Sequence, residues 1–177
     1  MATQKWIADT DHSEIKFRVK HMMITNVTGR FNDFKIEAYS EGEDFSDGTV
    51  TFVAKTESID TDNDKRDEHM RSSDFFEVSK YPEIRFKSTK YEKKDKNSFK
   101  LTGDLTIKDK TNSVTLDGEL GGIAKDPWGN EKAGFSLEGK INRKDWGLNW
   151  NASLEAGGVL VSDEVKISCE VQLVHAD

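Results

Sequence analysis

Apolar and polar residues alternate with a period of two along most of this chain. In EIKFRVK (residues 14–20), for example, Ile15, Phe17 and Val19 are each followed by a basic residue. Such alternation is typical of a strand that has one apolar and one polar face. The pattern predicts eight strands, over residues 14–20, 31–39, 49–55, 83–91, 98–109, 114–122, 133–142 and 164–174.

The segments between the expected strands are short and rich in turn residues. KDKTN (108–112) and DPWGN (126–130) are expected at hairpin tips, and the basic run KYEKKDKNSFK (90–100) is expected at a solvated tip. Many short strands with little helix favour an all-β fold, an antiparallel sandwich or barrel. Because no shift in composition marks a boundary, residues 1–177 are expected to form a single domain.

Three glycines fall on the apolar face of the later strands, at Gly103, Gly118 and Gly139. A glycine inside a strand leaves space above the backbone or marks a bend. The first alternative predicts a barrel with an open lumen, and the second predicts barrel curvature. Both favour a barrel, and eight strands can enclose one slender ligand.

Composition and charge restrict the classes of partner that this chain is expected to bind. The chain is 34% hydrophobic and 33% charged, with a formal net charge of -7, which argues against nucleic acid and anionic lipid head groups as partners. Cys169 is the single cysteine, so no intrachain disulfide can form, and its neighbours place it inward as an unreactive thiol. The sequence shows neither a signal-peptide core nor a bilayer-spanning stretch. We therefore expect a soluble protein without a stable membrane anchor, cytoplasmic as written and periplasmic if a signal peptide has been removed.

The segment SIDTDNDKRDEHMRSSDFF (58–76) is the least strand-like part of the chain. Its alternating acids suggest a calcium loop, but Lys65 and Arg71 occupy the positions of the required glycine and glutamate. The segment instead predicts a short helix over about 63–72, capped by Asp62 or Asp64. This helix would cover one end of the barrel, as a structural plug or as a lid with cations at the mouth.

The sequence lacks the motifs that mark metal binding, nucleophilic catalysis and phosphate binding. The four histidines share no metal-ligand spacing, and neither a nucleophile elbow nor a phosphate-binding glycine loop is present. We therefore expect no catalytic residue, no metal and no cofactor.

The chain resembles the YceI-like family, whose members are polyisoprenoid-binding, lipocalin-like barrels. The resemblance runs from Trp6 to about Leu173, and residues 58–88 carry its most specific part. The matching segments are WIADTDHSEIKFRVKH (6–21), GRFNDF (29–34), SIDTDNDKRDEHMRSSDFFEVSKYPEIRFKS (58–88), GDLTIKDKTNSV (103–114) and INRKDWGL (141–148). Asp109, Lys110 and Ser113 depart from the family's usual residues at one hairpin tip.

The resemblance implies an eight-stranded antiparallel barrel around an apolar pore, with the helix at one end. It implies a non-enzymatic protein that binds an isoprenoid or another long-chain lipid, such as a polyprenyl phosphate or a quinone, as carrier, store or protective protein. It also allows a homodimer. Two alternatives remain: an enzyme that acts on a lipid or quinone in the same pocket, and an interaction protein with a filled core.

Residue types suggest which side chains would contact a lipid in the barrel. The lumen candidates are Phe17, Val19, Phe34, Ile36, Phe52, Phe86, Leu101, Leu105, Leu116, Phe135, Leu137, Ile141, Ile167 and Val171. The head-group candidates at the mouth are Arg66, His69, Arg71 and Arg143. The lid candidates are Met70, Phe75 and Phe76.

Overall fold

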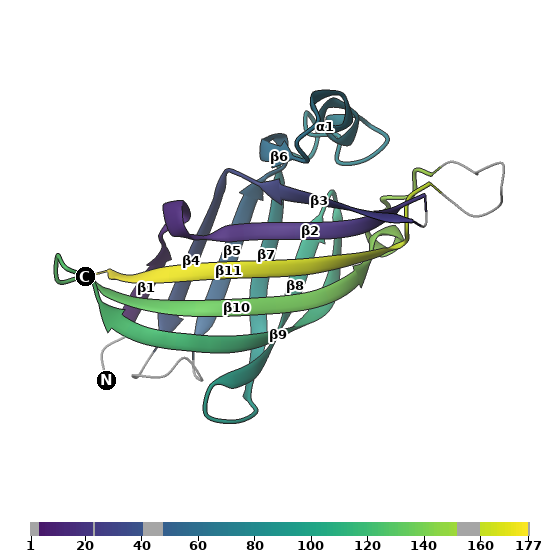
Figure 1. Cartoon of the computed structure of the whole chain (residues 1–177). Helices are drawn as coiled ribbons and strands as arrows, with labels where there is room; N and C mark the ends of the chain where they lie inside the picture. Colours follow the sequence, from purple (N-terminus) through teal and green to yellow (C-terminus); the bar gives the residue numbers. More distant parts are fainter. Residues whose placement is uncertain (1–3, 23, 41–47, 152–159, 177) are drawn as a thin grey trace.

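The computed structural model describes residues 4–22, 24–40, 48–151 and 160–176 (Figure 1). Its strands are β1 (Gln4–Ala8), β2 (Glu14–His21), β3 (Thr25–Phe31), β4 (Phe34–Ser40), β5 (Thr49–Lys55), β6 (Ile59–Asp60), β7 (Glu83–Lys93), β8 (Ser98–Ile107), β9 (Lys110–Lys125), β10 (Glu131–Asn142) and β11 (Glu164–Ala176). Its helices are α1 (Asp64–Arg71) and the short 3₁₀ turns η1 (Thr10–His12), η2 (Thr56–Ser58) and η3 (Arg143–Trp146).

Within these residues, eight strands close into an antiparallel barrel. Their order around the barrel is β1-β4-β5-β7-β8-β9-β10-β11, and β11 pairs again with β1. The predicted all-β barrel is therefore confirmed. The strands from β7 to β11 follow each other in sequence and pair as neighbours. Short hairpin connections explain this order from β7 to β10, whereas residues 143–163 lie between β10 and β11.

The sheet branches at β11, which the sequence pattern did not predict. The first half of β11 pairs with β2, for example Ile167 with Phe17, while its last residues pair with β1. A side sheet of β2, β3 and β6 thus extends from the barrel. The predicted strand 14–20 exists as β2 but lies outside the ring, whose eighth member is β1.

Two further boundaries differ from the prediction. The expected strand 31–39 divides, because Phe31 ends β3 while Phe34 begins β4. The expected tip 108–112 is shorter, since β8 ends at Ile107 and β9 begins at Lys110. Lys108 there adopts the left-handed conformation, with φ of 59°.

The apolar faces of the strands point into the barrel as the alternation predicts. In β8 the buried positions are Phe99, Leu101, Gly103, Leu105 and Ile107, and the residues between them are exposed or half-buried. On the outside, Thr102 and Thr106 hydrogen-bond the hydroxyls of threonines on β9. The barrel wall is therefore apolar inside and polar outside.

The inward glycines do not leave open space, which corrects one prediction. A methyl group built on Gly103 would overlap the ring of Phe86, one on Gly118 would overlap Phe99, and one on Gly139 would overlap Leu116. A neighbouring side chain lies over each glycine, as when an aromatic ring covers a glycine across a sheet. Each glycine therefore makes room for a neighbouring side chain against the barrel wall. The cavity does not come from the missing side chains of these glycines.

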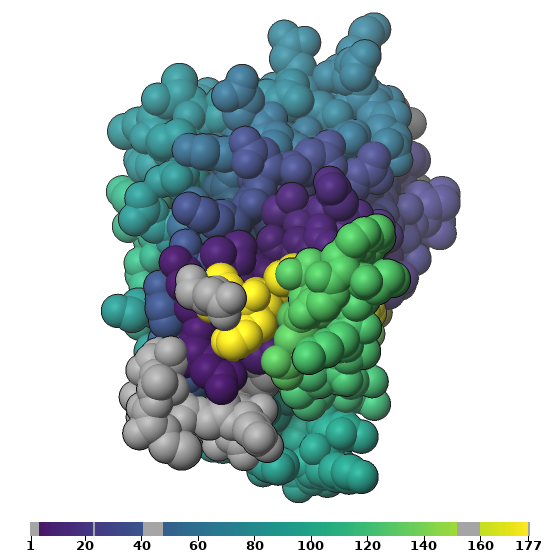
Figure 2. Space-filling model, turned by 90° about the vertical axis from the view of Figure 1, so that its left-hand side faces the viewer, coloured from purple at the N-terminus to yellow at the C-terminus, as the bar shows by residue number. Residues whose placement is uncertain are grey.

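The predicted helix is α1, which lies beside β6 at the end of the barrel where β7 begins (Figure 1). Its cap is Asn63 rather than the expected Asp62 or Asp64, and the Asn63 side chain accepts a hydrogen bond from the backbone N–H of Arg66 at 3.0 Å. Figure 2 shows the left-hand side of Figure 1, where the N-terminal strand, the β9–β10 turn and the C-terminal strand lie together.

Candidate ligand-binding site

The barrel encloses a cavity of about 500 Å³, within the range of small-molecule sites. Every lumen candidate except Phe34 lines it. Phe34 is buried and packs against Phe52 at a ring-centroid distance of 6.4 Å, so it supports the cavity wall without forming it.

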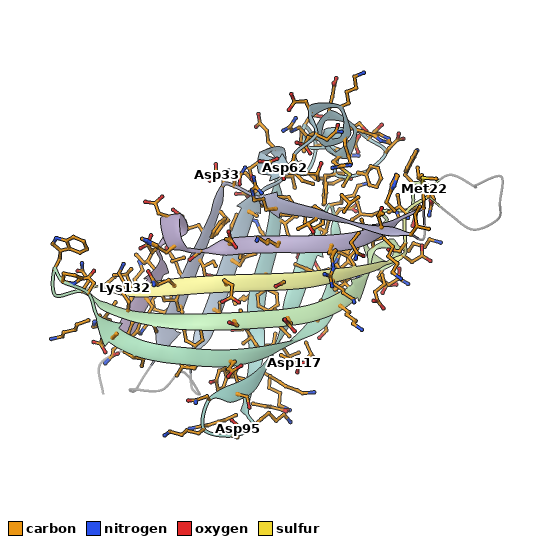
Figure 3. All side chains as sticks on the ribbon, in the orientation of Figure 1. Met22, Asp33, Asp62, Asp95, Asp117 and Lys132 are labelled. Carbon is orange, nitrogen blue, oxygen red and sulfur yellow. The ribbon has the colours of Figure 1, made fainter. Side chains whose placement is uncertain are left out.

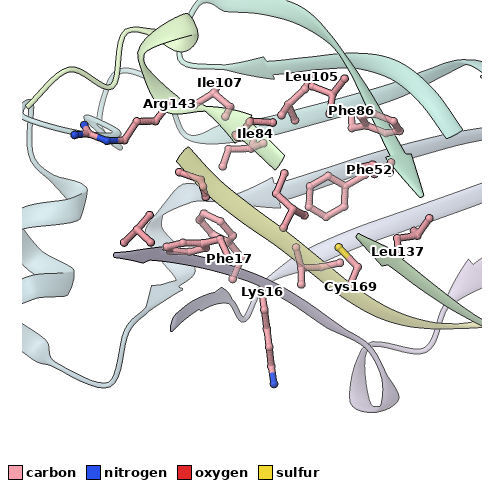
Figure 4. Close-up of a pocket in the computed structure, with 18 of the residues that line it drawn as sticks. Lys16, Phe17, Phe52, Ile84, Phe86, Leu105, Ile107, Leu137, Arg143 and Cys169 are labelled. Carbon is pink, nitrogen blue, oxygen red and sulfur yellow. The ribbon is translucent and has the colours of Figure 1, made fainter. Parts of the chain in front are cut away.

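The wall of this cavity consists almost entirely of hydrocarbon. The side chains of Phe17, Phe52, Phe86 and Leu137 come from different strands and surround the same space (Figure 4). A polar group placed among them would lose its hydrogen bonds to water without replacing them. The interior can therefore accept an apolar chain and disfavours a polar ligand.

Cys169, the single cysteine of the chain, lines this cavity. It is buried on β11 between Ile167 and Val171, and burial raises the pKa of its thiol to about 12. The thiol stays protonated and does not act as a nucleophile at neutral pH.

Arg66 and Lys65 from α1 bring positive charge to one end of the cavity. The Arg66 guanidinium donates to Thr61, from Nε to the hydroxyl at 2.8 Å and from Nη2 to the carbonyl at 2.6 Å. The Thr61 hydroxyl in turn donates to the buried carboxylate of Asp67. This chain of bonds fixes the orientation of Arg66 at the cavity edge.

His69, Phe75 and Trp150 form an aromatic cluster at the same end. The His69 ring meets Trp150 edge-on at 4.6 Å and Phe75 at 5.2 Å, and its Nε2 lies 2.8 Å from a carboxylate oxygen of Asp74. The three lid candidates, Met70, Phe75 and Phe76, all line the cavity. Met70 lies on α1, and Phe75 and Phe76 follow the helix, so a covering role for these three side chains stays a prediction.

Arg143 also borders the cavity, but the structure gives it another role. It is 3% exposed, and its guanidinium donates to four backbone carbonyls, those of Leu148, Trp150, Val161 and Ser162. Burial lowers its pKa. These bonds use four of the five N–H donors of the guanidinium, which argues against the predicted head-group role of Arg143.

Arg71 is not among the residues that line the cavity, which argues against its predicted head-group role. Its Nε donates to the carbonyl of Glu57 at 3.0 Å, and its Nη2 lies 3.4 Å from the carbonyl of Ile59. Arg71 therefore ties the end of α1 to the segment that precedes it.

Sequence reasoning missed several residues at this end. Trp150, Leu160 and Val161 line the cavity although they lie in segments without alternation, and Lys20 and His21 line it at the end of β2. Val161 bridges to His21 and bonds the Asn151 side chain. We call Lys20, His21, Lys65, Arg66, His69, Trp150, Leu160 and Val161 the rim.

Among the described residues, no group of three or more histidine, cysteine, aspartate or glutamate side chains could hold a metal ion. No helix in that part of the chain is both long and apolar enough to cross a membrane.

A closed antiparallel barrel with an apolar interior, covered by a helix, defines a lipocalin-like barrel protein. The sequence model of the YceI-like domain matches residues 6–173. The chain therefore belongs to the YceI-like family.

Relatives and solved structures agree with this assignment. A UPF0312 protein of Staphylococcus aureus is 38% identical over 165 residues, which cover 93% of this chain and 94% of the relative. The crystal structure of a YceI protein from Campylobacter jejuni is 34% identical, with a TM-score of 0.75 over 89% of this chain and 90% of that one. A polyisoprenoid binding domain from Saccharophagus degradans shares the fold, at 14% identity and a TM-score of 0.67 over 97% and 98% of the two chains.

Proposed function

We propose that this protein binds a long-chain isoprenoid, or a similar amphiphilic lipid, with its tail in the barrel and its polar end at the rim. The observation that carries the proposal is the apolar cavity whose rim includes the cations Lys20, Lys65 and Arg66. Burial of a tail contributes about 0.8 kcal/mol per methylene group before the costs of association.

The rim favours a ligand with an anionic end, such as a polyprenyl phosphate. Arg66 is half-buried and held by Thr61, so it meets an anion with little loss of side-chain freedom. A binding role as carrier, store or protective protein requires no catalytic group. The apolar wall and the protonated Cys169 thiol support binding rather than catalysis.

Native mass spectrometry of the freshly purified protein, followed by lipid extraction, tests the proposal. We expect one lipid per barrel, or uptake of one added polyprenyl phosphate or quinone. In Leu137→Trp, the larger ring fills part of the cavity and should abolish uptake. Ser136→Trp places the same ring outside on the adjacent residue, where the Ser136 side chain bonds Glu170, and should leave uptake unchanged. A bare protein that takes up neither lipid, or equal uptake by both variants, would refute the proposal.

A second comparison tests the head-group site. Arg66→Gln should weaken polyprenyl phosphate binding about tenfold, because a charged hydrogen bond contributes about 1.5–3 kcal/mol, and should spare quinone binding. Arg71→Gln serves as the matched control, because Arg71 lies outside the cavity lining. Equal effects of both variants, or equal loss for both ligands, would place the phosphate elsewhere.

A further inference from the structure

Three cations lie directly opposite one another on the outer face of neighbouring strands. Arg18 on β2 pairs in register with Lys166 on β11, which pairs with Lys140 on β10. Like charges in such positions repel and destabilise a sheet. Among the described residues, Arg18 and Lys166 form no ion pair, and Lys140 reaches Glu164 only at 4.0 Å. We call these three residues the basic row.

The basic row borders a groove of about 640 Å³ on the outside of the barrel. Lys16 adds a fourth cation, and its side chain points away from the lumen (Figure 4), with its ammonium 3.0 Å from Glu14. Asp117 and Glu138 also line the groove, on β9 and β10. The cations of the groove therefore lie on β2, β10 and β11, and its acids lie on β9 and β10.

The β2–β3 turn exposes apolar side chains at the end of the same strand. Met22 is 43% exposed and Ile24 is 78% exposed. Met22 lies just past the end of β2 (Figure 3). Its N–H donates to the carbonyl of Leu160 at 2.8 Å, which joins the turn to the rim. Four residues of strand, roughly 13 Å, separate Arg18 from Met22. We call Met22 and Ile24 the apolar tip.

We propose that this face docks reversibly on an anionic lipid bilayer. The apolar tip enters the head-group region, and the basic row faces the lipid phosphates, the combination by which peripheral proteins bind anionic membranes. The net charge of -7 predicts repulsion at long range, but the local row acts at contact, where nearby lipid charges are least screened.

A lipid surface fits these observations better than a soluble anion. A soluble anion explains the cluster of cations but gives no reason for an exposed Ile24 in the turn that follows β2. Docking also sets the rim on the membrane, so that a tail passes into the barrel without crossing water. This last consequence rests on the proposed function, whereas docking itself does not require a ligand in the barrel.

Sedimentation with lipid vesicles tests the proposal on the full chain. We expect binding to vesicles of phosphatidylcholine with phosphatidylglycerol, little binding to phosphatidylcholine alone, and loss of binding as salt rises. Arg18→Gln with Lys166→Gln should weaken binding roughly 25-fold, since each cation near the surface contributes about fivefold. Lys93→Gln with Lys96→Gln removes the same charge near the β7–β8 turn and should have little effect.

A second pair of variants identifies the end that docks. Ile24→Ser should weaken vesicle binding, while Trp128→Ser should not, although Trp128 is 83% exposed in the β9–β10 turn on the other side of the molecule (Figure 1). The basic-row variant should melt no lower than the native protein, because it loses like-charge repulsion, and should keep its uptake of a lipid dispersed in detergent, which separates docking from ligand binding. Failure to bind anionic vesicles at low salt, equal loss in the lysine control, or dependence on Trp128 instead of Ile24 would overturn the proposal.

Discussion

Replacement of Arg143 by methionine should destabilise the protein strongly. Methionine keeps a long apolar stem but removes every donor, which leaves the carbonyls of Leu148, Trp150, Val161 and Ser162 without their charged partner. The Asn151 side chain still donates to Val161, so three carbonyls lose their side-chain donor, and at about 1 kcal/mol for each the loss is about 3 kcal/mol. The variant no longer carries the cost of burying the guanidinium, so we expect a net loss of about 2–3 kcal/mol, a large part of a typical stability of about 5–15 kcal/mol.

Urea unfolding followed by tryptophan fluorescence measures this loss. Trp146 is a suitable reporter because it is 3% exposed and donates from its indole to the carbonyl of Leu105 at 2.8 Å. Arg18→Met is the matched control: Arg18 is exposed, so its replacement should change the free energy of unfolding by less than about 0.5 kcal/mol. A loss below about 1 kcal/mol in Arg143→Met, or an equal loss in the control, would show that the four carbonyls do not depend on Arg143.

Two further predictions concern titration. Burial raises the pKa of Cys169 to about 12, so a thiol reagent should label the folded protein far more slowly than the urea-unfolded protein at pH 8. Mass spectrometry measures the labelling, and rapid labelling of the folded protein would contradict the prediction. The hydrogen bond from His12 and the ammonium of Lys132 lower the pKa of Asp9. The Asp9 carboxylate therefore stabilises the fold above the ordinary aspartate pKa, and this stabilisation is lost as the pH falls through the pKa of Asp9 in the folded protein. The free energy of unfolding of Asp9→Asn should fall less than that of the native protein between pH 6 and pH 3, and parallel curves would contradict the assignment.

Alternation located most of the barrel because it reflects a local property, the face to which each side chain points. It fails where a strand is short or polar. In β1, Trp6 alone is buried among five residues, and β3 begins with the polar residues of TNVTGRF. Yet β1 closes the ring, because it pairs with both β11 and β4. Closure depends on pairing between distant segments, which a single sequence does not encode locally.

The same limit explains the errors at the site. The inward direction of Gly118 follows from alternation, but the ring of Phe99 above it follows from register, which pairs these two residues. Residue type alone marks the arginines as head-group candidates, whereas the groups that each arginine contacts determine its role. Arg66 faces the cavity, while Arg143 binds carbonyls up to 19 residues away. Residue type predicts what a side chain can do, and its neighbours determine what it does.

The branch at β11 separates closure of the barrel from formation of part of its cavity wall. Phe17, Val19 and Phe31 line the cavity, yet they belong to the side sheet and not to the closed ring. Along β11, five residue pairs join β2 to the ring, whereas β10 and β11 share eleven. The side sheet can therefore shift, or change in sequence, while the ring keeps its own hydrogen bonds. In this architecture the size of the cavity can evolve independently of the stability of the barrel.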